Sequence, residues 1–190
     1  MNSLVEFLRK TITLPDEEEF KIKKIVRERT IPQGYKFVCE GEVPTKFAFV
    51  HEGFFRYYYL KEKGVEFTKS FITQGNFISA YSAMITEKPS PMFIEALTDS
   101  VLYEIHYSDW LVLRAGDPCW NQLLIKMLEK AFSIKEMRER ELLLLDAKQR
   151  YKNFQRDFPE IERSIKQHLI ASYLGISPVS LSRIRKKYQR

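Results

Sequence analysis

Five basic side chains occupy the last eight positions of the chain, Arg183 to Arg190, in a segment whose apolar residues recur at regular intervals. A guanidinium group can form two parallel hydrogen bonds with guanine, and ammonium groups bind phosphate oxygens. Arg183 is therefore the candidate for a base contact, and Lys186, Lys187 and Arg190 are candidates for phosphate contacts. These residue types predict recognition of a polyanion and not a chemical reaction.

Uncharged residues beside these cations complete a candidate surface for DNA. A serine hydroxyl can hydrogen-bond to a base or a phosphate, and the Val179 side chain can contact a thymine methyl group. Gln167 and His168 precede this segment and are expected near the DNA backbone. The predicted DNA-binding residues are Gln167, His168, Ser177, Val179, Ser180, Arg183, Lys186 and Lys187.

Two helices joined by a tight turn are needed to present this surface. Ala171 is small enough for the point where the second helix crosses the first, and Gly175 accepts the positive φ that the turn demands. Ser177 is a favourable N-cap for the second helix, and Pro178 suits its first position. The segment therefore predicts a helix-turn-helix whose second helix enters the major groove of DNA. The apolar residues that would face each other are Ile170, Leu174, Ile176, Leu181 and Ile184.

The positive charge of the chain is concentrated near its C-terminus. Residues 147–190 contain 11 Lys or Arg and three Asp or Glu, a net charge of +8, whereas residues 1–146 have a net charge of −2. Such asymmetry indicates a local site for a polyanion and not a general property of the surface.

Groups that would support catalysis or a metal site are scattered. His51, His106 and His168 lie far apart without the spacing of metal ligands, and Cys39 and Cys119 form neither a disulfide framework nor a metal cluster. No nucleophile–histidine motif or phosphate-binding loop motif occurs. We therefore expect no enzyme, including one of the cupin type that a β-barrel would allow, and no metal or cofactor.

Between about residues 29 and 105, short runs of β-branched and aromatic residues alternate with turn signals. This spacing predicts antiparallel strands in a sandwich, roll or barrel. Residues 79–92 interrupt the strands and predict a short helical turn followed by a loop. The glycines that mark the turns are Gly34, Gly41, Gly53, Gly64 and Gly75.

A long helix is predicted from residue 118 to residue 145, because apolar residues recur there with a period near 3.5. Its length, about 40 Å at 1.5 Å per residue, and its second apolar side indicate a partner subunit. An ordinary core helix is the alternative. The second side contains Leu123, Ile125, Leu128 and Phe132, and the predicted dimer contacts are Leu124, Met127, Ala131 and Ile134.

The terminal segment QHLIASYLGISPVSLSRIRKK resembles the DNA-binding motif of the Crp/Fnr (cyclic-AMP receptor protein and Fnr) superfamily of bacterial transcription regulators. IPQGYKFVCEGEVPTKFAFVHEGFFRYYYL is similar to the opening strands of that family's cyclic-nucleotide-binding β-roll, and QGNFISAYSAMITEKPSPMFIEALTDSVLYEI is similar to its later half. The resemblance implies an α+β fold with an antiparallel β-roll sensor over residues 1–116. It also implies that a dimerisation helix follows over 117–145, and then a helix-turn-helix domain over 146–190 without a complete wing. It also implies a symmetric homodimer with recognition helices in successive major grooves.

Two charged groups that hold the nucleotide in this family are missing. In nucleotide-binding relatives a Glu holds the ribose and an Arg neutralises the cyclic phosphate; the matching positions here are Ala80 and Ser90. A buried phosphate without a cation loses a charge-assisted pair and keeps its desolvation cost. We therefore expect weak or no binding of cyclic AMP, in a pocket that is empty or takes a more apolar ligand. The predicted pocket residues are Phe77, Ser79, Ala80, Tyr81, Ser90 and Met92.

The leading prediction is a homodimeric, sequence-specific DNA-binding transcription regulator that does not respond to cyclic AMP. The alternative is a ligand-sensing β-roll module that signals through protein contacts, which would not need the basic C-terminus. Expected partners are double-stranded DNA, a second copy of the chain and RNA polymerase. No apolar run approaches the roughly 20 residues that span a bilayer, and no signal-peptide pattern occurs, so we expect a cytoplasmic location and no membrane partner.

Overall fold

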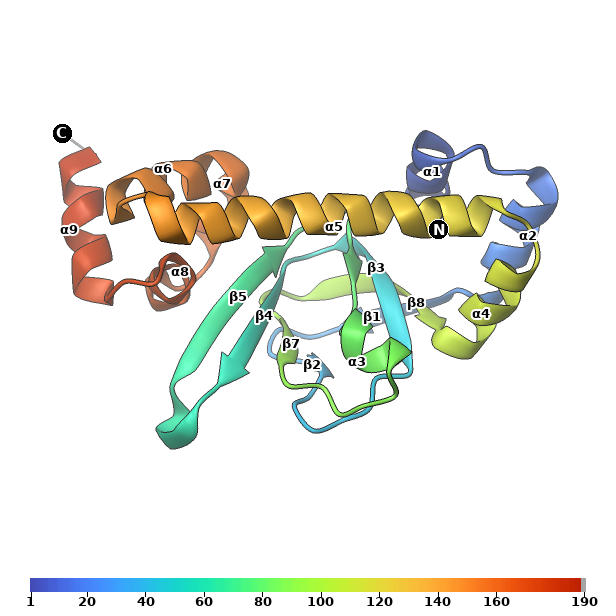
Figure 1. Ribbon diagram of the computed structural model, residues 1–190, viewed down its shortest axis with the longest axis horizontal. Helices are drawn as coiled ribbons and strands as arrows, with labels where there is room; N and C mark the ends of the chain where they lie inside the picture. Colours follow the sequence, from blue (N-terminus) through green and yellow to red (C-terminus); the bar gives the residue numbers. More distant parts are fainter. Residues whose placement is uncertain (189–190) are drawn as a thin grey trace.

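The computed structural model describes residues 1–188, without the side chains of Lys63 and Tyr188. Its longest element is helix α5 (Cys119–Leu144), which extends about 39 Å at 1.5 Å per residue. Strands lie beneath the middle of α5, three helices pack at its first end and the C-terminal helices at its other end (Figure 1). The three helices are α1 (Asn2–Thr11), α2 (Asp16–Ile25) and α4 (Tyr107–Ala115).

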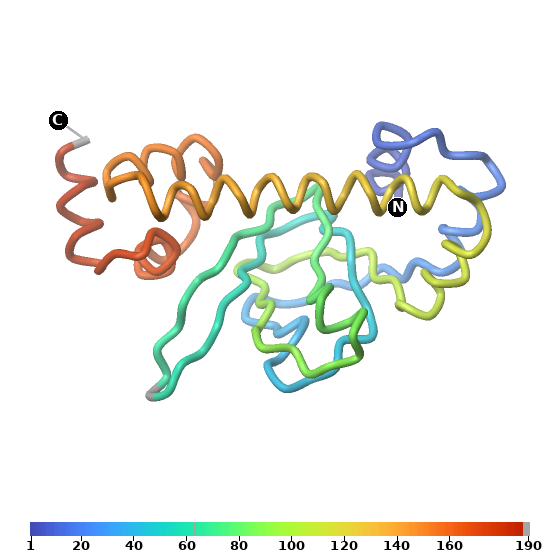
Figure 2. Tube along the Cα trace, in the orientation of Figure 1, coloured from blue at the N-terminus to red at the C-terminus, as the bar shows by residue number. Residues whose placement is uncertain are grey.

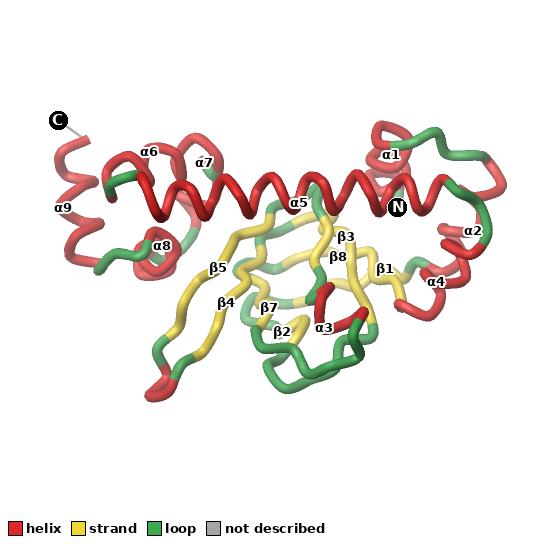
Figure 3. Tube along the Cα trace, viewed as in Figure 1, coloured by secondary structure: helices red, strands yellow, loops and turns green. Residues whose placement is uncertain are grey.

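The strands form two four-stranded antiparallel sheets that face each other as a roll (Figure 3). In one sheet the order is β1-β8-β3-β6, and in the other it is β2-β7-β4-β5, so β5 is an edge strand. A 3₁₀ turn at Glu62–Gly64 joins β4 to β5, and α3 (Tyr81–Ile85) follows β6. The strand bounds are β1 Arg27–Ile31, β2 Lys36–Val38, β3 Lys46–Glu52, β4 Phe55–Leu60, β5 Glu66–Ile72, β6 Phe77–Ile78, β7 Phe93–Ala96 and β8 Ser100–His106.

Three clusters of buried apolar side chains hold these elements together. One fills the interior of the roll, with Phe55, Ile78 and Ile94 among its fully buried members. A second packs α1, α2, α4 and the start of α5 against the outer side of β3 and β8, and it contains Trp120. The third joins the C-terminal helices to the roll, because it includes Phe71 of β5.

The C-terminal part of the chain is entirely helical over the residues that the structure describes. Asp146 begins α6 (Ala147–Asp157) with a capping box, since its carboxylate accepts the Gln149 N–H at 2.8 Å and the Gln149 side chain accepts the Asp146 N–H at 3.0 Å. Then follow α7 (Pro159–Ser164), α8 (Gln167–Leu174) and α9 (Pro178–Tyr188). The tube view shows α9 at the end of the molecule remote from the N-terminal helices (Figure 2).

The predicted fold class is confirmed: an antiparallel roll precedes a long helix and a terminal pair of short helices. The division into residues 1–116, 117–145 and 146–190 stays a prediction. The third cluster crosses that division, because Phe71 belongs to a strand of the roll and its neighbours belong to the terminal helices.

Candidate nucleic-acid interface and ligand cavity

The turn between α8 and α9 has the backbone conformation that a helix-turn-helix requires. Gly175 ends α8 with φ of 66° and ψ of 36°, in the left-handed region that favours glycine. The N–H of Ile176 donates to the carbonyl of Ala171 at 3.0 Å, which closes the last turn of α8 as a Schellman motif. The chain therefore changes direction within two residues.

The start of α9 is fixed by a serine cap. The Ser177 Oγ accepts the backbone N–H of Ser180 at 3.1 Å, as an N-cap does, and Pro178 takes the first helical position. The two serine hydroxyls also lie 2.9 Å apart. The side chain of Ser180 is therefore already engaged with its own helix in the free protein.

The inner sides of α8 and α9 form the core that the apolar pattern predicts. Ala171, Leu174 and Leu181 are completely buried, and Ile176 and Ile184 pack beside them. Ala171 has no side chain beyond its methyl group, so α9 can approach α8 closely at this point.

The outer side of α9 is the candidate interface for nucleic acid. Val179 is 60% exposed, and Arg183, Lys186 and Lys187 are exposed as well. Ion pairs of these three cations with carboxylates are absent from the described residues, whereas Arg185 pairs with Glu162 at 3.2 Å. This arrangement leaves cations free for an external anion. Of the other predicted residues, Gln167, His168 and Ser177 are exposed and Ser180 is half-buried, and Arg190 lies outside the described residues.

His168 lies away from this outer side. It lines a groove of about 580 Å³ between the roll and the C-terminal helices, together with Lys166, Arg56 and Glu66. The structure therefore brings Val179, the cations of α9 and the Ser177 cap onto one helix, and places His168 at the junction with the roll.

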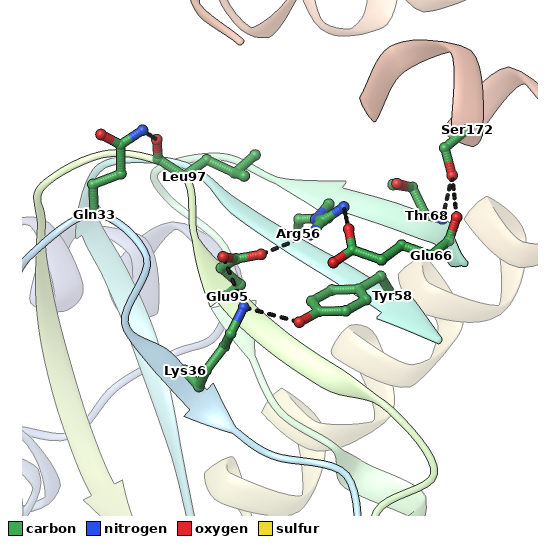
Figure 4. A network of polar contacts seen from close by, with 9 residues as sticks. All are labelled: Gln33, Lys36, Arg56, Tyr58, Glu66, Thr68, Glu95, Leu97 and Ser172. Atoms are coloured by element: carbon green, nitrogen blue, oxygen red, sulfur yellow. Dashed lines mark hydrogen bonds and ion pairs between the residues drawn. The ribbon is translucent and has the colours of Figure 1, made fainter. Parts of the chain in front are cut away.

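A network of ion pairs borders the same groove (Figure 4). Arg56 of β4 is buried and donates to Glu66 and to Glu95, each at 2.7 Å. Lys36 pairs with the second carboxylate oxygen of Glu95 at 2.7 Å. Burial opposes ionisation of Glu95, but the hydrogen bonds from Lys36 and Arg56 hold its pKa below the ordinary value.

One serine joins the C-terminal helices to the edge of the roll. This serine is Ser172 of α8. Its Oγ accepts the N–H of Thr68 at 2.9 Å and donates to the carbonyl of Glu66 at 3.1 Å (Figure 4). Both partners belong to β5, an edge strand whose outward backbone groups have no neighbouring strand. The sequence patterns do not predict this role of Ser172. For the ion pairs of Arg56, the one signal in the sequence is the position of this cation between Phe55 and Tyr57.

An apolar cavity of about 320 Å³ lies between the roll and the middle of α5. Of the predicted pocket residues, Phe77, Ser79 and Tyr81 line it. The other three belong to the core around it: Ala80 and Met92 are buried in the roll interior, and Ser90 is buried with its hydroxyl donated to the Met92 carbonyl at 2.8 Å. The remaining lining residues are Phe47, Tyr57, Ile72, Met84, Trp110, Leu124, Met127, Leu128 and Ala131.

Tyr57 supplies a buried phenol to this cavity. Its hydroxyl accepts the backbone N–H of Ser79 at 2.9 Å. Burial raises the pKa of Tyr57 to about 12, despite the hydrogen bond to the Ser79 backbone, so the phenol is neutral at physiological pH. The cavity therefore contains hydroxyl groups and no ionised side chain among the described residues that line it.

The predicted dimer contacts divide between two sides of α5. Leu124 and Met127 are half-buried against their own chain, whereas Ala131 and Ile134 are exposed. The apolar stripe at Ile125, Leu128 and Phe132 is exposed by 55%, 43% and 67%.

The structure also bears on metal and membrane sites. Within residues 1–188 no three His, Cys, Asp or Glu side chains gather as a metal site would require. None of the helices in the described part has the length and apolar character to cross a bilayer.

Comparison with known proteins finds one family model that is similar to the roll. Residues 28–117 match the model of the cyclic nucleotide-binding domain. Among curated protein sequences, none is similar enough to this chain to count as a relative.

Several solved structures share the arrangement of the whole chain. CLP of Xanthomonas campestris, a c-di-GMP-responsive global regulator, is 16% identical with a TM-score of 0.73, and the match covers 92% of each chain. FixK2 of Bradyrhizobium japonicum is 18% identical with a TM-score of 0.75, over 87% of this chain and 85% of that one. A protein of Eubacterium rectale assigned to the Crp/Fnr family of transcriptional regulators is 17% identical with a TM-score of 0.73, over 93% and 84%. Residues 28–117 thus match the family model of the cyclic nucleotide-binding domain, and the chain as a whole has the fold of the Crp/Fnr transcription regulators.

Proposed function

We propose that this chain is a homodimeric, sequence-specific DNA-binding transcription regulator that does not respond to cyclic AMP. The observation that supports DNA binding most directly is the outer side of α9, where Arg183, Lys186 and Lys187 are exposed beside Val179. The inner side of the same helix is completely buried at Leu181, so the helix can present only this basic side to a partner.

Each residue of this side has a definite role in the proposal. Arg183 forms a bidentate contact with a guanine in the major groove, and Val179 packs on a thymine methyl group. Lys186 and Lys187 bind phosphates and set the orientation of the helix on the duplex without selecting a sequence. The solved structures with this fold include regulators of gene expression, which supports the same output here.

A second copy of the chain is the proposed partner of α5. The exposed residues Ile125, Leu128 and Phe132 are spaced by three and four positions, as in the contact seam of paired helices. Isolated apolar residues on a surface are ordinary, but a stripe along one helix indicates an interface. The dimer seam therefore lies one position beyond Leu124, Met127 and Ala131 of the predicted contacts. The proposal also includes RNA polymerase as the partner that receives the regulatory output.

The proposal does not include cyclic AMP as a ligand, because the roll has uncharged residues where a nucleotide would need charged ones. Ala80 and Ser90 stand where nucleotide-binding relatives have a Glu and an Arg, and Ser90 is buried and already hydrogen-bonded to Met92. The described residues that line the cavity provide no cation for a cyclic phosphate. Burying that phosphate would therefore cost desolvation without a compensating ion pair.

Binding-site selection from random double-stranded DNA, followed by mobility shifts at two salt concentrations, tests the proposal. We expect a selected sequence with two related half-sites and an affinity that falls as salt rises. Arg183→Ala should weaken specific binding by about 1–3 kcal/mol and relax selection at one base position. Arg29→Ala, which removes an exposed arginine from β1, is the matched control and should change neither. Cyclic AMP and cyclic GMP should leave every result unchanged.

Absence of retardation at low salt would contradict DNA binding and favour a sensor that signals through protein contacts. The dimer is tested separately by sedimentation. Phe132→Glu should shift the protein to monomers, whereas Ser133→Glu adds the same charge at the neighbouring exposed position and should not.

A further inference from the structure

We infer that Arg150 and Arg138 are specificity-determining residues, because they fix the spacing that the protein accepts between two DNA half-sites. This inference rests on the proposed function. It concerns the joint where the end of α5 meets α6 and α8 (Figure 1). Since the two α5 helices of the proposed dimer pair with each other, the geometry of this joint sets the separation of the two α9 helices.

The first observation is a guanidinium group that connects the ends of two helices. Arg150 lies in the first turn of α6, and its Nε donates to the carbonyl of Leu174, the last residue of α8, at 3.1 Å. Its Nη1 donates to the carbonyl of Leu145, directly after α5, at 2.5 Å. One planar side chain with a fixed arrangement of donors therefore holds the C-terminal ends of α5 and α8 together.

The second observation is a direct contact between α5 and α8. The guanidinium of Arg138 donates to the carbonyl of Tyr173 and lies over the ring of the same residue, 3.8 Å from its centroid. Asn153 of α6 also donates to Glu141 of α5 at 2.6 Å. The helices α5, α6 and α8 are therefore connected pair by pair, so a rotation of α8 against α5 would break more than one contact.

The third observation is the incomplete pairing of Arg138. Its Nε and Nη1 are buried and have no hydrogen-bond partner among the described residues. The Glu141 carboxylate lies 3.9 Å from Nη1 and already accepts the hydrogen bond from Asn153. Burial of a charge with so little pairing lowers stability, so a gain in stability does not account for this residue. A role in holding α8 at a defined position on α5 does.

The spacing of the half-sites follows from the joint. The completely buried Ala171 and Leu181 hold α9 on α8, so a fixed α8 also fixes α9 relative to α5. The half-sites of a helix-turn-helix dimer lie about 34–36 Å apart, and one additional base pair moves the second half-site by about 3.4 Å and turns it by about 35° around the DNA axis. A rigid joint therefore accepts one spacing, whereas a loosened joint should accept several.

The experiment is a binding selection from DNA in which both half-sites have the sequence chosen by the wild type and the number of base pairs between them varies. We expect the wild type to prefer one spacing over its neighbours by about tenfold or more. Arg150→Lys keeps the charge but replaces the planar group with one ammonium, and it should reduce this preference to about threefold. Arg138→Gln should act in the same direction. The bases selected within each half-site should stay unchanged, because α9 itself is unaltered.

Arg140→Gln is the matched control, because it removes an exposed arginine two positions further along α5 and should keep the preference of the wild type. Thermal unfolding of all variants identifies a merely structural role. A variant that is only less stable loses affinity for every spacing by the same factor and keeps its preference.

An unchanged preference in both Arg150→Lys and Arg138→Gln would overturn the inference and leave the proposed function standing. A wild type that binds several spacings equally would do the same. Absence of DNA binding by the wild type would overturn the proposed function and this inference together.

Discussion

The hydroxyl of Ser172 and the backbone N–H of Thr68 lie 2.9 Å apart, although 104 residues separate them along the chain. This hydrogen bond joins the first helix of the helix-turn-helix to the edge strand of the roll. The same hydroxyl donates to Glu66, so one side chain satisfies two outward backbone groups of β5.

Ser172→Ala should therefore loosen the contact between the two parts of the molecule. The Thr68 N–H would lose its protein partner, and we expect a destabilisation of about 1 kcal/mol together with faster hydrogen exchange at Thr68. Exchange measured by NMR tests this. Ser164→Ala is the control, because the Ser164 hydroxyl donates to Glu160 in its own helix; equal acceleration at Thr68 in both variants would contradict the role of Ser172.

Gly175 should resist substitution for a purely conformational reason. Its φ of 66° strains any residue with a β-carbon, so Gly175→Ala should lower the free energy of unfolding by about 1 kcal/mol. Space is not the obstacle, because among the described residues only Leu142 would come within 4 Å of an added β-carbon, at 3.8 Å. Gly175→Asn should cost less, since asparagine tolerates the left-handed region better. Chemical denaturation of the three proteins provides the comparison, and a cost for Asn as large as that for Ala would show that the loss arises from packing.

The cations of α9 should determine how DNA affinity depends on salt. Each phosphate contact releases counterions, so Lys186→Ala or Lys187→Ala should reduce the slope of log affinity against log salt by about 1. Selection of the DNA sequence should stay unchanged, because a lysine–phosphate contact does not distinguish bases. Lys10→Ala removes an exposed lysine from α1 and should leave the slope as it is. A slope unaffected by both α9 variants would place the DNA elsewhere.

Tyr57 should make the protein less stable in alkali. The pKa of Tyr57 is about 12 in the folded protein and about 10 in the unfolded chain, so the unfolded state releases its proton first. This contribution to stability is complete below pH 10 and is lost as pH rises toward 12, with a total of about 2–3 kcal/mol. Burial also raises the pKa of the Cys119 thiol to about 12, so that group falls partly in the same window. The difference between the wild-type and Tyr57→Phe stability curves isolates the tyrosine; parallel curves from pH 9 to 12 would contradict the prediction.

Local sequence patterns are sufficient for the terminal helices and for the class of the roll. Gly175 and Ser177 predict their own backbone roles because turns and caps depend on neighbours within a few residues. The alternation of short strands and glycines likewise predicts antiparallel sheets, although it does not order them.

Contacts between distant parts of the chain lie beyond such patterns. Nothing in the neighbourhood of Ser172 indicates a partner in β5, and the burial of Arg56 depends on Glu66 and Glu95 from two other strands. The division of α5 into a side against its own roll and an exposed side also depends on where the roll lies. A period of 3.5 predicts one stripe and leaves its partner undetermined. The assignment of Leu124 and Met127 to the dimer stays a prediction, and both residues also pack against their own chain.

The presence of Phe71 in the cluster of the terminal helices has a practical consequence. Its ring lies 5.9 Å from that of Phe154 and 5.3 Å from that of Tyr173. A fragment that begins at residue 146 would lack Phe71 and would expose the rings of Phe154 and Tyr173 to water. A chimaera that joins helices α6 to α9 to another roll would therefore need a host strand with an equivalent ring, because the exposed apolar side chains would otherwise favour aggregation.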